Sequence, residues 1–265
     1  MRPLAPAALL LALSLLALSA CEDRQGNEED ETVEEQVRGP ALQATDPEPE
    51  LATPDPHWVE SRVLDAEEQL VTDAGELLWA SIEAHGGLSG FFLSGPLSFT
   101  AAHTSEERGY FVDTWSARVV AWPTDDEDAR TVTSDGDAFD TLALVALPFL
   151  LSGPGITLES LGDVEVAGET HHHLRATASD SLDLFDTLEI YLHGESHLLG
   201  AVRYPETEER RSRFLTYDTY EEVGSISLAT RIRTFADIES TDPESIVELS
   251  GLTFRPDLEV EEFHP

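Results

Sequence analysis

The chain has 265 residues and is strongly acidic, with 53 Asp and Glu residues against 15 basic residues and a formal net charge of −38. This charge excludes nucleic-acid binding through clustered positive side chains and electrostatic attachment to anionic lipid. Cys21 is the only cysteine, which excludes an intrachain disulfide and a thiolate metal cluster.

The first twenty residues have the pattern of an export signal. Arg2 precedes an apolar run over residues 4–18, and small residues lead into Cys21. Residues 18–21 (LSAC) resemble the lipobox of a bacterial lipoprotein signal peptide, which implies cleavage of residues 1–20 and acylation of Cys21. An ordinary signal peptide and a short transmembrane anchor are the alternatives, although the run is short for a span and no positive charge follows it.

Residues 21–56 are predicted to be the lipidated cysteine followed by a disordered acidic tether. The segment has several acidic runs, a Pro-rich stretch at residues 45–50 and few apolar side chains. Such a segment cannot bury enough surface to offset its conformational entropy, and its charges and prolines keep it extended. We expect a spacer between membrane and domain, with a binding tail as the alternative.

Residues 57–265 are expected to form one domain that opens with a helical pattern. Apolar residues recur on one helical face from residue 58 to residue 82. Asp73 and Glu76 have the spacing of a capping box, which predicts a break or restart of the helix there. The His-Gly-Gly sequence at residues 85–87 predicts the end of the helix.

The rest of the domain has a strand-like pattern with short turns, which favours an antiparallel meander. An apolar segment at residues 138–151 interrupts it and predicts a short helix packed on or inside the sheet. The expected strands are residues 91–103, 110–122, 130–134, 156–166, 169–179, 185–193, 197–204, 211–220, 223–235 and 246–254.

Several pieces of this domain, in order, resemble bacterial exported proteins of the outer-membrane lipoprotein-sorting (LolA/LolB-like) superfamily, and especially its uncharacterised lipid-anchored members. The resemblance covers roughly residues 72–265. The pieces are IEAHGGL (82–88), LPFL (147–150), GITLE (155–159), LGDVEVAG (161–168), LTFRPD (252–257) and EFHP (262–265).

This resemblance implies a mainly β (α+β) fold. The expected architecture is a strongly curved antiparallel sheet, or half-closed β-barrel, with an N-terminal helix and a short inserted helix covering its concave face. In the family's best-known members the cavity holds acyl chains, and no catalytic residues belong to the family. The candidate cavity-lining residues in this chain are Phe99, Trp115, Trp122, Phe149, Phe185 and Tyr191. A filled core is the alternative for each, because a pocket and a core share their composition.

The run of three histidines at residues 171–173 is the sharpest polar cluster. His171 and His173 would share one face of a strand, and two imidazoles on one face can hold a metal. No recognised metal-binding spacing is present, so we predict no metal and no cofactor. A third ligand would have to come from elsewhere, and the candidates are His103, His193 and His197.

No nucleophile elbow, Walker motif or dinucleotide fingerprint is present, so we expect no enzyme and no catalytic residues. The acidic loops at residues 125–128 and 134–137 lack the remaining ligands of an EF-hand.

The sequence favours a lipid-anchored cell-envelope protein whose domain faces the periplasm and binds a lipid or acyl chain without catalysis. The alternatives are a structural or interaction lipoprotein with a filled core and, third, a metal-dependent enzyme that uses the histidines. The expected partners of the chain are the membrane, through N-terminal acyl chains, and a hydrophobic ligand. The sequence indicates no protein partner.

Overall fold

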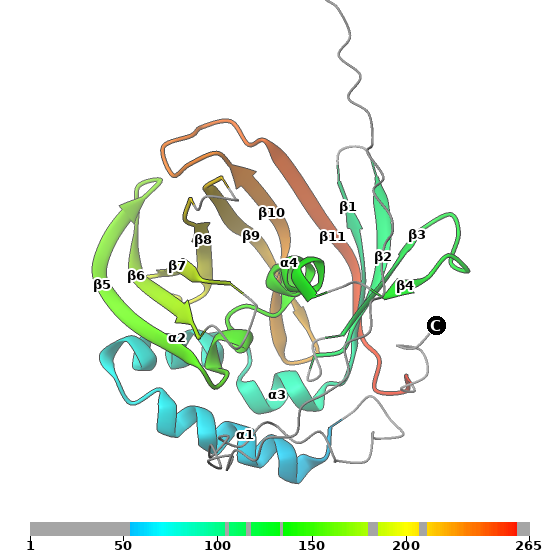
Figure 1. Cartoon of the computed structure of the whole chain (residues 1–265), viewed down its shortest axis with the longest axis horizontal. Helices are drawn as coiled ribbons and strands as arrows, with labels where there is room; N and C mark the ends of the chain where they lie inside the picture. The colour runs from blue at the N-terminus through cyan, green and yellow to red at the C-terminus, as the bar shows by residue number, and fades with distance from the viewer. Residues whose placement is uncertain are drawn as a thin grey trace, which may run out of the picture. The chain divides into compact units, whose positions relative to one another are not determined.

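The computed structural model describes residues 54–103, 106–114, 118–132, 135–179, 185–206 and 211–258. The predicted signal peptide, Cys21 and nearly all of the predicted tether lie outside these residues. The helices are α1 (Pro56–Gln69), α2 (Asp73–Ala84), α3 (Leu88–Leu93), α4 (Asp135–Val145) and the 3-10 helix η1 (Phe149–Ser152) (Figure 1).

The strands form one antiparallel sheet in the order β4-β3-β2-β1-β11-β10-β9-β8-β7-β6-β5. Two meanders, β1 to β4 and β5 to β11, join where β1 pairs with β11, and the sheet curves strongly without closing (Figure 1). The predicted half-closed barrel is therefore confirmed. The strands are β1 (Leu97–Ala102), β2 (Glu107–Val112), β3 (Val119–Pro123), β4 (Thr131–Val132), β5 (Ile156–Val166), β6 (Glu169–Ala178), β7 (Thr187–His193), β8 (Leu199–Tyr204), β9 (Arg213–Val223), β10 (Ile226–Phe235) and β11 (Ser245–Phe254).

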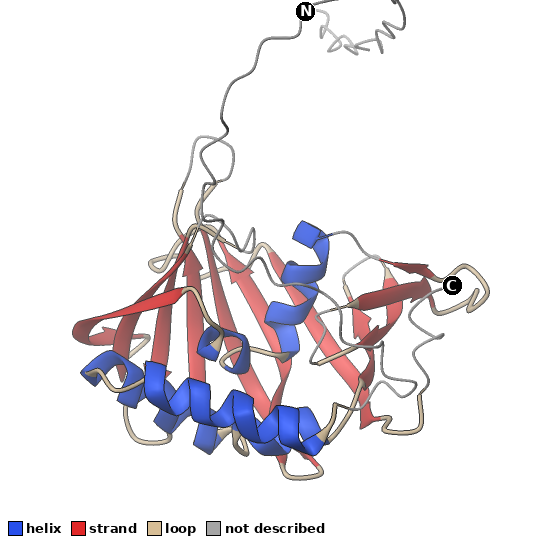
Figure 2. Cartoon of the chain, turned by 60° about the horizontal axis from the view of Figure 1, so that its bottom comes forward, coloured by secondary structure: helices blue, strands red, loops and turns tan. Residues whose placement is uncertain are grey.

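The two faces of the sheet have different environments. Along β7, Leu188, Ile190 and Leu192 belong to the main hydrophobic core, whereas Tyr191 belongs to a separate cluster. Successive side chains of a strand point to opposite faces, so the main core lies on one face only. We call this the concave face, because α4 lies within the curve of the sheet on that side, and we call the other the convex face (Figures 1 and 2).

The predicted break in the first helical region is confirmed between α1 and α2. Its cap differs from the prediction, because Thr72 rather than Asp73 is the N-cap residue. The Thr72 hydroxyl accepts a hydrogen bond from the amide of Gly75 at 3.1 Å. Asp73 and Glu76 lie in the first turn, where negative charge is favourable near the positive end of the helix dipole.

The His-Gly-Gly sequence ends α2 as predicted, and it also docks the helix on the sheet. The amide of Ser227 donates a hydrogen bond to the carbonyl of His85 at 3.0 Å. Gly86 has a φ of +107°, and a Cβ placed there would lie 2.1 Å from the carbonyl oxygen of Ser225. Only glycine therefore permits the close approach of this turn to the β9–β10 hairpin.

Two predicted strands differ from the structure. Residues 91–93 complete α3, where Phe91 and Phe92 are buried in the main core, and β1 begins only at Leu97. A short apolar run fits a buried helix as well as a strand, so the pattern did not separate them. Residues 110–122 are two antiparallel strands, β2 and β3, rather than one.

Candidate functional site

The concave face is the apolar side of the half-barrel. Its floor consists of buried apolar residues from neighbouring strands, each at most 2% exposed: Leu174, Ala176, Leu188, Ile190, Leu192, Leu199, Val202, Leu228 and Ile232. The helices α1 to α3 cross one end of the curved sheet, and α4 lies inside its curve (Figures 1 and 2). A sheet with one covered face has this arrangement, because its apolar face must be removed from water.

The inserted segment formed by α4 and η1 covers part of this floor. α4 contacts β3 and β10, and η1 contacts α2. Phe149 of η1 stacks on Phe91 of α3, with ring centroids 4.0 Å apart. The hydroxyl of Tyr217, on β9, donates a hydrogen bond to the carbonyl of Ala143 at 3.0 Å and so ties α4 to the sheet.

Tyr217 is well suited to this role. Burial raises the pKa of its phenol well above the ordinary value, so the hydroxyl keeps its proton and remains a donor. Tyr220 is also buried, and burial likewise raises its pKa. Its hydroxyl donates instead to the carbonyl of Leu199 on β8, a contact that does not involve α4. The two tyrosines therefore tie different parts of the structure.

The six predicted cavity residues fall in different places. Phe99, Phe149 and Phe185 belong to the main core or pack against it. Trp122 packs with Phe111, Val120 and Leu258, and Tyr191 packs with Val166, Ala201, Phe214 and Phe235.

Both of these satellite clusters lie on the convex face, because Ala121 and Ile190, the neighbours of Trp122 and Tyr191, belong to the main core. Trp122 and Tyr191 therefore do not line the concave face, and Trp115 lies outside the described residues. The fact that a residue is aromatic did not predict which face of its strand the side chain occupies.

His85 is a buried titratable group beside the inserted segment. Its ring has edge contacts with Phe149 and Tyr220, at 6.1 and 5.6 Å between centroids. Its Nδ1 donates a hydrogen bond to the carbonyl of Ser81 at 2.7 Å. Burial lowers the pKa of His85 from 6.5 to about 4, so the ring is neutral at neutral pH.

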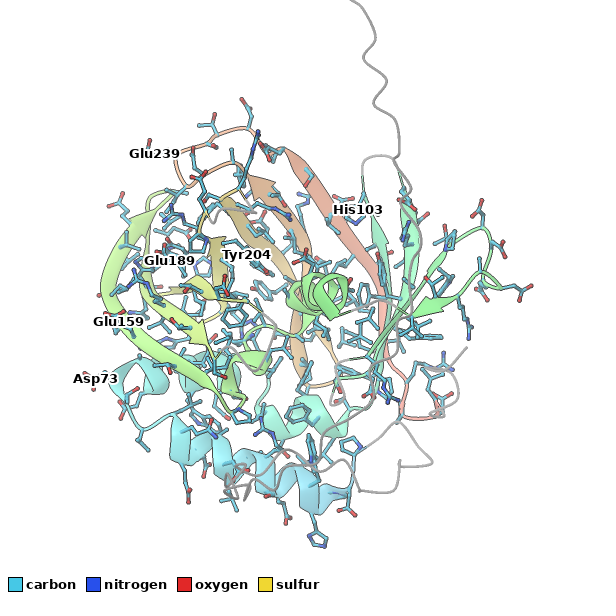
Figure 3. All side chains as sticks on the ribbon, viewed as in Figure 1. Asp73, His103, Glu159, Glu189, Tyr204 and Glu239 are labelled. Atoms are coloured by element: carbon cyan, nitrogen blue, oxygen red, sulfur yellow. The ribbon has the colours of Figure 1, made fainter. Side chains whose placement is uncertain are left out.

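The convex face carries a ladder of charged cross-strand pairs. Glu159, Arg175, Glu189 and Arg203 follow one another across β5 to β8, with nitrogen–oxygen distances of 3.1, 3.7 and 3.1 Å. Figure 3 labels Glu159 and Glu189 on their strands. Burial raises the pKa of Glu189, but the hydrogen bond and charge of Arg203 outweigh it, so the pKa lies below its ordinary value. Such pairs stabilise neighbouring strands.

Polar side chains also surround Tyr191. Burial, followed by the Glu189 carboxylate, raises the pKa of Tyr191 to about 12, and its hydroxyl donates a hydrogen bond to Glu189 at 3.2 Å. His173 stacks on the Tyr191 ring with centroids 4.5 Å apart, and burial lowers its pKa. Nε2 of His173 also lies 3.5 Å from the Glu189 carboxylate, so His173 contacts the ladder rather than His171.

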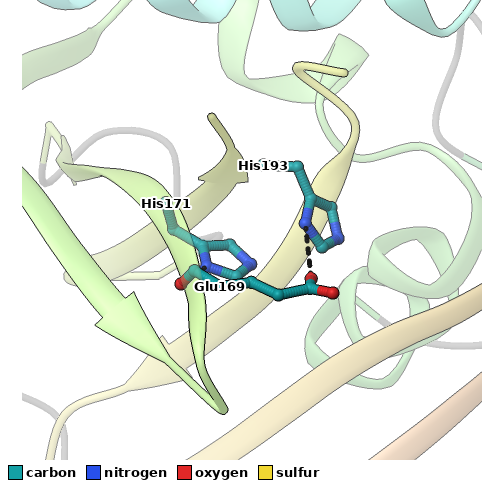
Figure 4. A group of neighbouring side chains, drawn as sticks. All are labelled: Glu169, His171 and His193. Atoms are coloured by element: carbon teal, nitrogen blue, oxygen red, sulfur yellow. Dashed lines mark hydrogen bonds and ion pairs between the residues drawn. The ribbon is translucent and has the colours of Figure 1, made fainter. Parts of the chain in front are cut away.

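The histidine run meets other histidines across the sheet. His171 lies opposite His193 on β7, with ring centroids 4.5 Å apart, and Glu169 lies beside both (Figure 4). His172 points to the other face, where it contacts Asp163 at 2.7 Å and stacks near His197.

The remaining third-ligand candidate, His103, is far from this cluster. It follows β1 (His103 is labelled in Figure 3), and five strands separate β1 from β6 in the sheet order. The predicted pairing of His171 with His173 therefore gives way to a cluster of Glu169, His171 and His193.

Solved structures that resemble this chain include a LolA superfamily protein from Nitrosomonas europaea, with 10% identity, coverage of 73% of this chain and 98% of that one, and a TM-score of 0.47. A DUF1329 family protein from Desulfovibrio piger has 12% identity, coverage of 79% and 98%, and a TM-score of 0.40. A domain described as an outer-membrane lipoprotein-sorting protein from Vibrio parahaemolyticus has 12% identity, coverage of 75% and 97%, and a TM-score of 0.44. No protein-family model and no curated protein matches the chain. Because these TM-scores lie below 0.5, the fold assignment rests on the strand order and curvature of the chain itself.

His193 was one of three candidate third ligands predicted from the sequence, but neither Glu169 nor the position of His193 opposite His171 was predicted, although one signal for that pair exists. In a β-hairpin, the two residue numbers of each directly opposed pair add up to the same value. The position of the turn therefore determines every cross-strand pair, including His171 with His193. The predicted strands at residues 169–179 and 185–193 carry this signal, because positions 179 and 185 at their adjoining ends have the same sum as 171 and 193. Within the described residues, no helix is long and apolar enough to cross a membrane.

Proposed function

We propose that this chain is a lipid-anchored cell-envelope protein that binds an acyl chain, or a similarly apolar ligand, on the concave face of its half-barrel without catalysis. The anchor part of the proposal rests on the lipobox-like sequence that ends at Cys21. The observation that supports ligand binding is the cover of the concave face. An inserted segment, rather than a second sheet, occupies the curve, and Tyr217 ties it to the sheet.

Energy considerations favour exchange between this segment and a ligand. Leu142, Val145, Leu147, Phe149 and Leu151 are all at most 4% exposed. Exposing five such side chains costs on the order of 10 kcal/mol, so the segment does not leave the sheet spontaneously. An acyl chain of about 14 methylenes gains a comparable free energy on burial, at about 0.8 kcal/mol each. A single acyl chain can therefore replace the contacts of the segment.

The alternative is an envelope protein that acts through its surface, with no small-molecule ligand. The observation that favours it is the tight stack of Phe149 on Phe91, in which both rings are at most 1% exposed. In that case the inserted segment is a permanent part of the core.

The two candidate functions differ in whether the purified protein carries a bound lipid. The test uses the full chain with Cys21→Ser, which removes the acylation site, and native mass spectrometry of the purified protein. Acyl-chain binding predicts a co-purified mass of a lipid, together with saturable binding of a fluorescent fatty acid. Neither is expected for the alternative.

A variant pair tests the role of the inserted segment. Tyr217→Phe removes the hydrogen bond to Ala143 and keeps the ring, which weakens the covered state by about 1 kcal/mol. The affinity for the fluorescent fatty acid should then rise about fivefold, because the ligand competes with the segment. Tyr220→Phe is the matched control, since its hydroxyl bonds to β8, and it should leave the affinity unchanged. Two results together contradict the proposal. The purified protein carries no lipid, and it either binds no fatty acid or binds it with an affinity that Tyr217→Phe does not change.

A further inference from the structure

Three potential metal ligands meet where β6 begins and β7 ends. Glu169 and His171 are alternate residues of β6 on the convex face, and His193 is the cross-strand partner of His171. One ligand atom from each of the three residues lies within 4.8 Å of the others (Figure 4). They lie on the convex face, so a role here does not depend on acyl-chain binding on the concave face.

The imidazole of His171 is held in an orientation that suits a metal ligand. Its Nδ1 donates a hydrogen bond to the backbone carbonyl of Glu169 at 3.0 Å, so its proton is on Nδ1 and the lone pair is on Nε2. This is how a backbone carbonyl orients the histidines of metal sites. The residue is only 4% exposed, so the ring is held in this orientation by its surroundings as well as by the hydrogen bond.

A glycine leaves room for both imidazoles beside β8. A Cβ placed on Gly200 would lie 2.5 Å from Nε2 of His171 and 3.1 Å from Nε2 of His193. Both imidazoles therefore pack against the backbone of β8 at Gly200, and any larger residue there would displace them from this position. The backbone around them is fixed, because the amide of Gly194 donates a hydrogen bond to the carbonyl of Thr170 at 2.9 Å.

His193 and Glu169 lie within ion-pair distance but too far apart for a hydrogen bond. Nδ1 of His193 lies 3.4 Å from the nearer carboxylate oxygen, beyond the usual range for a hydrogen bond. Ligand atoms around a tetrahedral zinc ion lie about 3.4 Å apart, given metal–nitrogen distances of about 2.1 Å. The side chain of Glu169 is 69% exposed and can rotate to bring all three ligands to that separation.

We propose that Glu169, His171 and His193 bind one divalent transition-metal ion of the zinc class. Two imidazole nitrogens and one carboxylate oxygen suit Zn²⁺, whereas Ca²⁺ and Mg²⁺ require a shell of oxygen ligands. Three protein ligands leave the fourth position of the ion to water. The ion joins the ends of β6 and β7 beside Gly200 and so holds this corner of the sheet together.

The test measures zinc binding by the full chain with Cys21→Ser. That substitution removes the single thiol, which is itself a strong zinc ligand. Isothermal titration with ZnCl₂ should give one ion per chain, and Co²⁺ in its place should give the visible absorption of a low-coordinate nitrogen–oxygen site. In this background, Glu169→Gln and His193→Gln each remove a ligand from a partly exposed position, so both variants should fold.

Each of these two variants should weaken zinc binding at least about tenfold and abolish the Co²⁺ absorption. His172→Gln, on the same strand but the opposite face, and His57→Gln, on exposed α1, remove one imidazole elsewhere and should retain both properties. The proposal is overturned if the chain binds no zinc, or if Glu169→Gln and His193→Gln bind it as tightly as the two control variants.

Discussion

Protonation of His85 should destabilise the fold as the pH falls. Burial lowers the pKa of this histidine from 6.5 to about 4. In the unfolded chain the imidazole takes up a proton as the pH falls through about 6.5, whereas in the folded chain it does so only near the lower value. Its contribution to stability is therefore complete above the unfolded pKa, and it is lost progressively as the pH falls to the folded pKa.

The two pKa values give the size of this loss. Between pH 7 and pH 5 the free energy of unfolding should fall by about 2 kcal/mol on account of His85, and the complete shift is worth about 3 kcal/mol. The assay is urea denaturation at both pH values, followed by tryptophan fluorescence. His85→Asn places an amide nitrogen near the position of Nδ1, so it can still donate to Ser81, and it cannot titrate.

The variant should be less stable at both pH values, because the ring no longer fills its site between Phe149 and Tyr220. The informative quantity is the change with pH, which should be about 2 kcal/mol larger in the unmodified chain than in His85→Asn. His57→Asn removes a histidine that is 92% exposed and should behave like the unmodified chain. An equal fall in stability for the unmodified chain and His85→Asn would refute the reasoning.

Two further predictions concern the α2 turn and the membrane anchor. Gly86→Ala should destabilise the domain by at least about 2 kcal/mol more than Gly168→Ala, measured by urea denaturation, because both positions have positive φ but only Gly86 would bring a Cβ against a backbone oxygen. A similar loss of stability in the two variants would show that the backbone at Ser225 moves at little cost to accommodate the added Cβ. Cys21→Ser should move the protein from the membrane fraction to the soluble fraction with its far-ultraviolet circular dichroism unchanged, because a net charge of −38 offers no electrostatic attachment to anionic lipid. Retention of that variant on membranes would contradict lipid anchoring.

Local patterns predicted most of the strands and the helix boundaries. The predicted strand at residues 156–166 has the bounds of β5, and the break between α1 and α2 lies where the spacing of Asp73 and Glu76 indicated. These features depend on hydrogen bonds and side-chain alternation among residues close in sequence. The short apolar stretch around Phe91 and Phe92 was less decisive, because a buried helix turn and a strand carry the same residues there.

The candidate sites were predicted less well than the strands. His171 was recognised as a potential ligand, but it was paired with His173 on the same strand, and His193 across the hairpin was one of three candidates for a third ligand. Trp122 and Tyr191 were taken for cavity residues because they are aromatic, whereas the face that each occupies depends on its place in the pleat. Strand register determines which residues are paired across strands and which face each side chain occupies. A shift of one residue changes the partner and moves the side chain to the opposite face.

The sequence by itself determined that the chain is strongly acidic, and its local patterns predicted a helical region with a break, then a run of strands with one apolar insertion. Tertiary structure alone decided that the first strand, β1, pairs with the last, β11, and so turns two meanders into one curved sheet with the insertion inside it. It also decided which residues meet across strands, from the tie between Tyr217 and Ala143 to the cluster of Glu169, His171 and His193. The physical reason is that turns and alternation depend on neighbours in the chain, whereas these contacts join residues that only the folded sheet brings together.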